Sequence, residues 1–183
     1  MVKDAMIFAA GLGTRMLPLT KKIPKPLIKI NDKSLLRNNI ENLIEAKFDN
    51  IIVNAYLHAD QIVNEVRDFF PTVKVIIEEE RLETGGGIVN AMKNGYFKKD
   101  NPILLLNADI FWVNEIYNSI YKIRELWNQD KMDMLLCLKN NDNFFGYKGS
   151  GSFYFFDLDF DPSLLIYKEQ SSLVYTGLQI VKQ

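Results

Sequence analysis

Residues 5–27, "AMIFAAGLGTRMLPLTKKIPKPL", join a short apolar run to a glycine turn and a group of cations. The run "AMIFAA" (5–10) is continuously apolar and ends at a glycine, which predicts a buried strand. Ligands of open α/β sheets bind beyond the carboxyl ends of the strands. The turn at residues 11–16 is therefore predicted to lie where such a sheet would bind a ligand.

Strand and helix patterns alternate along the chain after this first strand. Strands are predicted at 50–56, 73–79, 102–109 and 133–139, and helices at 34–48, 59–70, 86–95 and 114–127. This alternation predicts parallel strands with crossover helices, and so an α/β protein with a three-layer α/β/α sandwich. After residue 140, strand-like runs follow without helices between them. An antiparallel extension of the mostly parallel sheet is therefore expected.

The bulk composition excludes several classes of protein. The chain has 183 residues, 22 basic and 23 acidic side chains and a net charge of −1, so no basic excess favours nucleic acid. One cysteine (Cys137) and one histidine (His58) allow neither an internal disulfide nor a His/Cys zinc site. No apolar run approaches the roughly 20 residues of a membrane helix. We expect a cytoplasmic protein that contacts no membrane.

The glycine turn has two interpretations. Gly11 and Gly13 permit positive φ and close approach of backbone N–H groups to an anion, yet Gly-x-Gly after a strand is also common as a plain turn. Arg15 can hold phosphate oxygens bidentately, and Lys25 is a point charge held between two prolines. Met16 breaks the G-x-G-x-x-G dinucleotide fingerprint, which disfavours a nicotinamide-dependent oxidoreductase.

The same residues closely resemble the signature loop of the sugar-1-phosphate nucleotidyltransferases, G-x-G-[ST]-R followed by P-K-P. The segments "RLETGGGI" (81–88), "LLLNADI" (104–110) and "VYTGLQI" (174–180) resemble further parts of that family. The form "LETGGG" looks most like the branch of N-acetylmuramate-1-phosphate uridylyltransferases and mannose-1-phosphate guanylyltransferase-like proteins. The resemblance covers essentially the whole chain, and it implies the Rossmann-like nucleotide-diphospho-sugar transferase fold.

The resemblance implies an enzyme in which a sugar-1-phosphate oxygen attacks the α-phosphorus of UTP or GTP. The products are a nucleotide sugar and pyrophosphate, and catalysis consists mainly of positioning and charge neutralisation. Arg15 would hold the departing phosphates, and Lys25 would stabilise charge on the α-phosphate; both are the implied catalytic residues. The implied nucleotide-binding residues are Ala10, Gly11, Gly13, Thr14, Arg15, Glu83, Thr84 and Gly85.

Asp109 ends the apolar run "PILLLNAD" (102–109). It could cap the helix predicted near residue 114. The family resemblance instead implies a Mg²⁺ ligand, because Mg²⁺ takes one or two carboxylates together with phosphate oxygens. Asn107 could support that site. The segment "ETGGG" (83–87) likewise reads either as a capped helix start or as a wall of the base pocket.

The sugar side of the site is implied by the later strands. Gly151, Thr176 and Gly177 resemble residues of the sugar-binding wall. Many relatives carry G-D-F where this chain reads "GSF" (151–153), so Ser152 replaces an acidic residue and the sugar contact is expected to change.

The resemblance also implies a longer protein. Relatives continue well beyond "YTGLQI", and that continuation supplies a second metal aspartate, whereas no D-x-G-T-like segment follows residue 170 here. We therefore expect residues 1–183 to form a single nucleotidyltransferase domain that is shortened at its C-terminus. A nucleotide-binding or regulatory module without turnover remains the alternative. Exposed apolar strands near 153–180 favour self-association, so a homo-oligomer is also expected.

Overall fold

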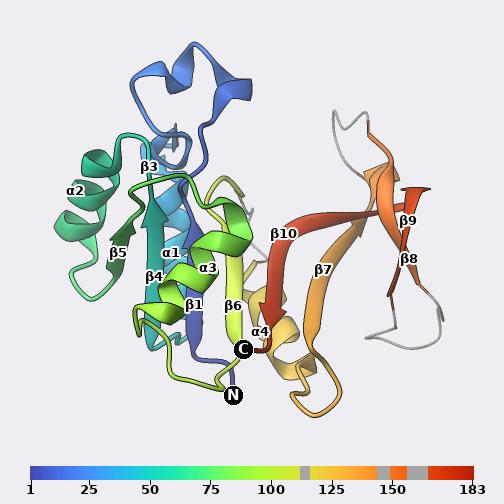
Figure 1. Cartoon of the computed structure of the whole chain (residues 1–183). Coiled ribbons are helices and arrows are strands. Elements are labelled where there is room, and N and C mark those ends of the chain that lie inside the picture. Colours follow the sequence, from blue (N-terminus) through green and yellow to red (C-terminus); the bar gives the residue numbers. More distant parts are fainter. Residues whose placement is uncertain (112–115, 144–148, 156–164) are drawn as a thin grey trace.

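The computed structural model describes residues 1–111, 116–143, 149–155 and 165–183, and it is built around one mixed β-sheet (Figure 1). The helices are α1 (Leu35–Glu45), α2 (Ala59–Phe69), α3 (Glu83–Lys93) and α4 (Ile116–Leu126). The strands are β1 (Asp4–Phe8), β2 (Lys29–Ile30), β3 (Lys33–Ser34), β4 (Asn50–Ala55), β5 (Lys74–Ile77), β6 (Ile103–Asn107), β7 (Met134–Asn140), β8 (Gly151–Phe155), β9 (Leu165–Ser171) and β10 (Leu173–Val181).

The sheet has the order β5-β4-β1-β6-β10-β8-β9, with β7 paired to β10. The neighbours β5, β4, β1 and β6 are parallel, as the alternating pattern predicts. Strand β10 pairs antiparallel with both β6 and β7, so it lies between two strands that run in the same direction. The predicted antiparallel extension is confirmed, and it begins inside the sheet rather than beyond β7.

Helices cover the two faces of the parallel strands unequally. One core cluster joins side chains of α1, α2 and α4 to the sheet, including the fully buried Leu36, Ile62 and Ile120. The opposite cluster contains Ala91 of α3 together with Met6 and other strand residues. Three helices thus lie on one face and α3 on the other, as Figure 1 shows, which gives the predicted three layers.

Local signals account for most of the element boundaries. The Ser34 side chain accepts a hydrogen bond from the Arg37 N–H (3.0 Å) and so caps α1, as its position predicts. Gly95 follows α3 with φ +71°, the left-handed conformation expected after a helix. The prediction for the start of α3 is wrong, because this helix begins at Glu83 and includes the whole segment 83–87.

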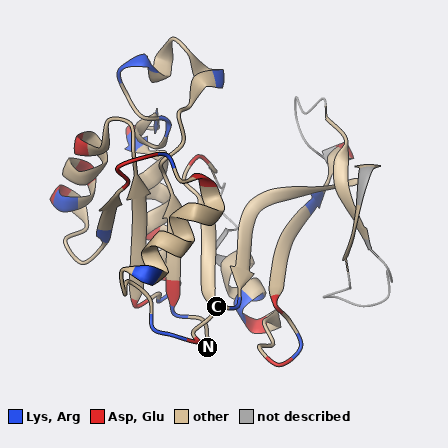
Figure 2. Ribbon diagram, viewed as in Figure 1, with Lys and Arg blue, Asp and Glu red and all other residues tan. Residues whose placement is uncertain are grey.

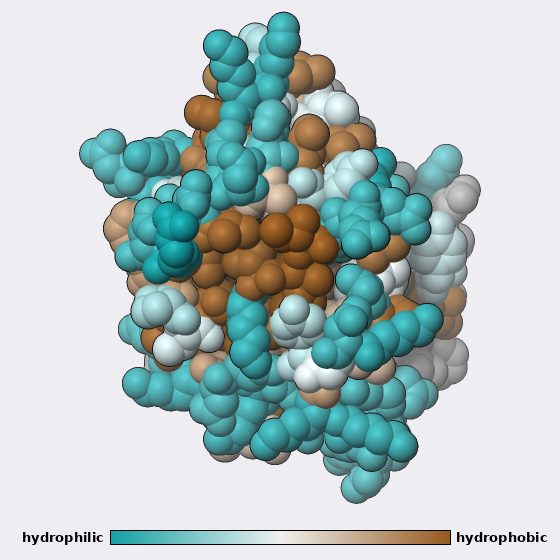
Figure 3. Space-filling model, turned by 60° about the vertical axis from the view of Figure 1, so that its left-hand side comes forward, coloured by the Kyte–Doolittle hydropathy of each residue, from teal (hydrophilic) through white to brown (hydrophobic). Residues whose placement is uncertain are grey.

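Several segments expose apolar side chains, among them strand β5 and the late strands. Viewed from the β5 side, Figure 3 shows an apolar patch bordered by hydrophilic residues. On this side Val75, Ile76 and Ile77 of the edge strand β5 line a shallow groove together with Leu82. In the late strands Tyr154 and Tyr167 are exposed, whereas Cys137 of β7 is half-buried. The predicted self-association stays a prediction. None of the helices in the described ranges is long and apolar enough to cross a membrane.

Candidate functional site

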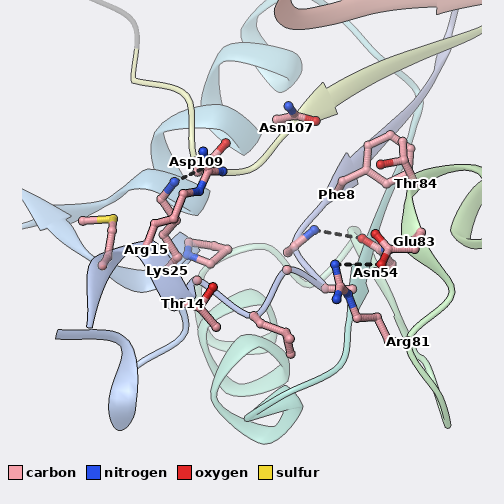
Figure 4. A pocket seen from close by; sticks show the side chains of 17 residues that line it. Phe8, Thr14, Arg15, Lys25, Asn54, Arg81, Glu83, Thr84, Asn107 and Asp109 are labelled. Carbon is pink, nitrogen blue, oxygen red and sulfur yellow. Dashed lines mark hydrogen bonds and ion pairs between the residues drawn. The ribbon is translucent and has the colours of Figure 1, made fainter. Parts of the chain in front are cut away.

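A cavity of about 410 Å³ opens at the carboxyl ends of β1 and β6, where the fold predicts a ligand (Figure 4). Its lining comes from the turn after β1, the segment around Lys25, the end of β6 and the start of α3. The lining residues are Phe8, Ala9, Ala10, Gly11, Leu12, Gly13, Thr14, Arg15, Met16, Lys25, Pro26, Asn54, Arg81, Glu83, Thr84, Asn107 and Asp109.

The turn after β1 is held by Gly13 rather than by both glycines. Gly13 has φ +64°, and its carbonyl accepts hydrogen bonds from the buried Thr20 hydroxyl (2.8 Å) and the Met16 N–H (2.9 Å). A side chain at Gly13 would lie 3.0 Å from the Thr20 methyl carbon. Gly11 does not have positive φ, which corrects the expectation for this residue, and a Cβ there would meet no described atom within 4 Å. The space above Gly11 is therefore open to the cavity.

The two predicted cations lie together on one side of the cavity (Figure 4). Lys25 is half-buried between the buried Pro24 and Pro26, and its ammonium forms an ion pair with the Asp109 carboxylate. Arg15 is exposed, and no carboxylate in the described parts of the chain pairs with it. Figure 2 shows basic residues on the protruding segment above the sheet. This side of the cavity therefore has unneutralised positive charge.

Asp109 is positioned by the buried Asn39 of α1. The Asn39 Nδ2 group donates to the carbonyls of Ala108 (3.2 Å) and Ile110 (3.1 Å), the residues on either side of Asp109. The Ala108 N–H donates to the Phe8 carbonyl (3.1 Å), which joins the turn to β1. Residues 110 and 111, which follow Asp109, are not helical, so Asp109 does not occupy the N-cap position of a helix. The carboxylate instead faces Lys25.

The opposite side of the cavity is formed by the segment that leads into α3. Arg81 and Glu83 form an ion pair (2.8 Å), and Thr84 lies beside them (Figure 4). Gly85, which is predicted to line the base pocket, is absent from the cavity lining. Arg81 was not predicted as a site residue, although it directly precedes the "LETGGG" segment.

Asn54 was also missed as a site residue. It lies one residue before the end of strand β4, in the cavity lining, and accepts a hydrogen bond from the Ala9 N–H (2.8 Å). Its only signal in the sequence is a polar residue near the end of an apolar strand, the same signal that identifies Asp109.

The predicted sugar-binding residues do not line this cavity. Gly177 of β10 has φ +87°, and a Cβ there would lie 2.8 Å from the Asn107 amide nitrogen, so its backbone lies directly beside a lining residue. The Thr176 hydroxyl donates to the Cys137 carbonyl (2.8 Å). Gly151 of β8 is buried against the backbone of Leu173. Their role in sugar binding stays a prediction.

Comparison with known proteins agrees with this geometry. The nucleotidyl transferase family model matches residues 4–150. N-acetylmuramate alpha-1-phosphate uridylyltransferase of Caulobacter vibrioides is 31% identical over 191 residues, which cover 98% of this chain and 75% of the relative. D-glycero-alpha-D-manno-heptose 1-phosphate guanylyltransferase of Campylobacter jejuni is 34% identical over 111 residues, 60% of this chain and 48% of the relative.

A solved structure extends the comparison to three dimensions. The crystal structure of HddC from Yersinia pseudotuberculosis in complex with GMP-PN superposes with a TM-score of 0.70 at 26% identity, and the match covers 99% of this chain and 77% of that one. The nucleotidyltransferase fold predicted from the sequence is thus confirmed. By sequence and by fold, the chain belongs to the nucleotidyl transferase family.

Proposed function

We propose that this protein is a sugar-1-phosphate nucleotidyltransferase that transfers a nucleoside monophosphate from UTP or GTP to a sugar-1-phosphate. The observation that carries the proposal is the grouping of Arg15, Lys25 and Asp109 beside the open turn at Gly11, around one cavity. A triphosphate needs cations and free backbone amides on one side, and this side of the cavity offers both. The relatives, which act on sugar-1-phosphates according to their names, support the same assignment.

In the proposed reaction an oxygen of the sugar-1-phosphate attacks the α-phosphorus, and the bond from this phosphorus to the β-phosphate oxygen breaks. Pyrophosphate leaves with the bonding electrons, so negative charge increases on the departing group. Arg15 would hold that group bidentately. Lys25 would exchange Asp109 for the α-phosphate, which requires only that the existing ion pair opens. The protein thus contributes position and charge, and no covalent intermediate is needed.

Asp109 fits the role of a magnesium ligand, with Asn107 beside it in the cavity lining. Within the described ranges no three His, Cys, Asp or Glu side chains are grouped to hold a metal without help. Mg²⁺ commonly binds one or two carboxylates together with substrate phosphates, so a single carboxylate suits a metal that arrives with the triphosphate. When bound, such an ion neutralises triphosphate charge and polarises the reacting phosphate.

A direct test is to incubate the full chain with Mg²⁺, each nucleoside triphosphate and a panel of sugar-1-phosphates, and to measure pyrophosphate release. We expect release with UTP or GTP, and mass spectrometry of the product identifies the base and the sugar. If nucleotide binds in calorimetry but no combination releases pyrophosphate, the chain is the alternative, a nucleotide-binding module on the same fold. If no triphosphate binds at all, both assignments are wrong.

Substitutions test the role of individual residues in these assays. Arg15→Ala should weaken triphosphate binding, whereas Lys21→Ala, which removes an exposed cation from the same segment but outside the cavity lining, should not. Asp109→Asn should keep nucleotide binding in the absence of metal and abolish turnover. Equal effects of the Arg15 and Lys21 variants would show that the turn attracts anions only through its general charge.

A further inference from the structure

A line of hydrogen bonds passes beneath the cavity through two buried side chains. The Ala9 N–H donates to Asn54 Oδ1 (2.8 Å), and Asn54 Nδ2 donates to Glu78 Oε1 (2.7 Å). The Leu82 N–H then donates to Glu78 Oε2 (3.3 Å). Asn54 is 2% exposed and Glu78 is 4% exposed. Three bonds thus connect the turn after β1 to the segment that leads into α3.

We infer that Asn54 and Glu78 are positioning residues that fix the two walls of the nucleotide pocket relative to each other. Ala9 directly follows β1 and lies two residues before Gly11, and Leu82 lies between Arg81 and Glu83. These two segments form opposite sides of the cavity, and Figure 4 shows Asn54 near the wall formed by Arg81 and Glu83. The inference rests on the proposed function, because it assigns how that same site keeps its shape.

The cost of burying Glu78 argues that this arrangement is more than packing. A carboxylate removed from water is expensive unless it is paired and hydrogen-bonded. In the described ranges no cation forms an ion pair with Glu78; its bonds come from the Asn54 amide and the Leu82 backbone. An apolar side chain would fill the same space at lower cost. The buried Glu78 carboxyl group after β5 is therefore explained by the Asn54 amide and the Leu82 N–H that it holds.

Helix α3 is positioned by the same pair. A Cβ at Gly87 would lie 2.9 Å from Asn54 Nδ2 and 3.0 Å from Glu78 Oε1, so the helix backbone packs directly on the two polar groups. The Glu78 N–H also donates to the Ala55 carbonyl (2.8 Å), which fixes Glu78 beside the end of β4. The pair therefore fixes how closely α3 approaches the sheet, and with it the position of Glu83 and Thr84 at the start of the helix.

Near-isosteric substitutions test the hydrogen bonds separately from the packing. Asn54→Asp places a second carboxylate against Glu78. Glu78→Gln places an amide NH2 group against the Asn54 Nδ2 group or the Leu82 N–H, both of which are donors. Each single variant therefore breaks at least one bond. In the double variant the new carboxylate accepts from Ala9 and from the new amide, whose oxygen accepts from Leu82. All three bonds are then restored with the middle one reversed, and the charge of the pair is unchanged.

Asn50→Asp is the matched control. Asn50 begins the same strand, and its Nδ2 donates to Asp4 Oδ1 (3.0 Å) and to the Tyr96 carbonyl (2.8 Å) at the amino end of the sheet. This substitution also puts two carboxylates together, but far along β4 from the cavity. It should lower stability without changing the pocket.

Two measurements on the full chain decide the outcome. Hydrogen exchange of the ligand-free protein should become about tenfold faster or more at residues 9–13 and 79–84 in each single variant, and return in the double variant. Calorimetry with MgUTP and with MgGTP should show about tenfold weaker binding in the single variants, and recovery in the double variant.

The inference is overturned if the double variant is no better than the single ones, or if Asn50→Asp changes the same segments equally. If the wild-type chain binds neither nucleotide, the proposed function fails. The exchange data still decide in that case whether Asn54 and Glu78 hold the two walls together.

Discussion

Two alanine substitutions in helix α3 should have opposite effects on stability. Gly85 and Gly87 lie two residues apart in the same helix, and neither has positive φ. A Cβ at Gly85 would meet no described atom within 4 Å. A Cβ at Gly87 would lie 2.9 Å from Asn54 Nδ2 and 3.0 Å from Glu78 Oε1. The two substitutions are identical in chemistry and differ only in what the added methyl group meets.

The expected magnitudes follow from this difference. Alanine gains up to about 1 kcal/mol over glycine through helix propensity, and Gly85→Ala should keep this gain. At Gly87 the methyl group must displace atoms that their other hydrogen bonds hold, and overpacking of this kind costs about 1–3 kcal/mol. Separating Asn54 from Glu78 would add about 1–3 kcal/mol for buried polar groups without partners. The propensity gain is common to both variants, so their free energies of unfolding should differ by the sum of the two costs at Gly87, about 2–6 kcal/mol.

Urea denaturation measures this difference, and calorimetric melting should show a gap between the two Tm values of roughly 4–24 °C for a chain of this size. The slope of unfolding free energy against urea should stay the same, because the surface that unfolding exposes does not change. Equal stabilisation by both substitutions would refute the reasoning. It would mean that the Asn54–Glu78 pair can shift freely beneath the helix, and it would remove the rigid contact on which the positioning of α3 depends.

Three further predictions concern other groups. Asn39→Asp removes the amide donor that holds the carbonyls beside Asp109, so Mn²⁺ binding with nucleotide, measured by electron paramagnetic resonance, should weaken by about tenfold. Lys25→Met frees the Asp109 carboxylate, so Mn²⁺ should bind more tightly without nucleotide, while calorimetry should show weaker triphosphate binding. Burial raises the pKa of the Tyr175 phenol, so its contribution to stability should be present below about pH 10 and decline above it. In urea denaturation at a series of pH values, Tyr175→Phe should remove this alkaline decline in the free energy of unfolding. In an ultraviolet absorbance titration, the same variant should lack one tyrosine that ionises at high pH.

The parallel part of the fold could be predicted because each element carries its own local signal. The continuous apolar run that became β6 indicates a central strand, and the capping residue Ser34 indicates the start of α1. The position of β10 between β6 and β7 could not be predicted in the same way. Strand pairing over such a distance along the chain depends on which edge of β6 remains free, and no local pattern encodes that choice.

In the candidate site, too, some residues could be predicted from the sequence and others could not. The prediction of Arg15, Lys25 and Asp109 rests on their positions after strands or between prolines together with the family resemblance, and the cavity brings all three together. Asn39 and Asn54 were not predicted as site residues, because each lies within an element and acts through backbone groups that are distant in the chain. Their partners become neighbours only when the strands align at one edge of the sheet.

The use of amides at these two positions follows from the chemistry of the proposed ligand. A lysine in place of Asn39 could also donate to the carbonyls beside Asp109, but its charge would compete with Lys25 for that carboxylate. A carboxylate in place of Asn54 could accept from the Ala9 N–H, but it would repel Glu78. A neutral amide provides the hydrogen bond and adds no charge, so Arg15 and Lys25 determine the electrostatic potential of the cavity. Fixing the backbone with uncharged groups therefore lets one small site attract the proposed polyanion and still keep a carboxylate for the proposed metal.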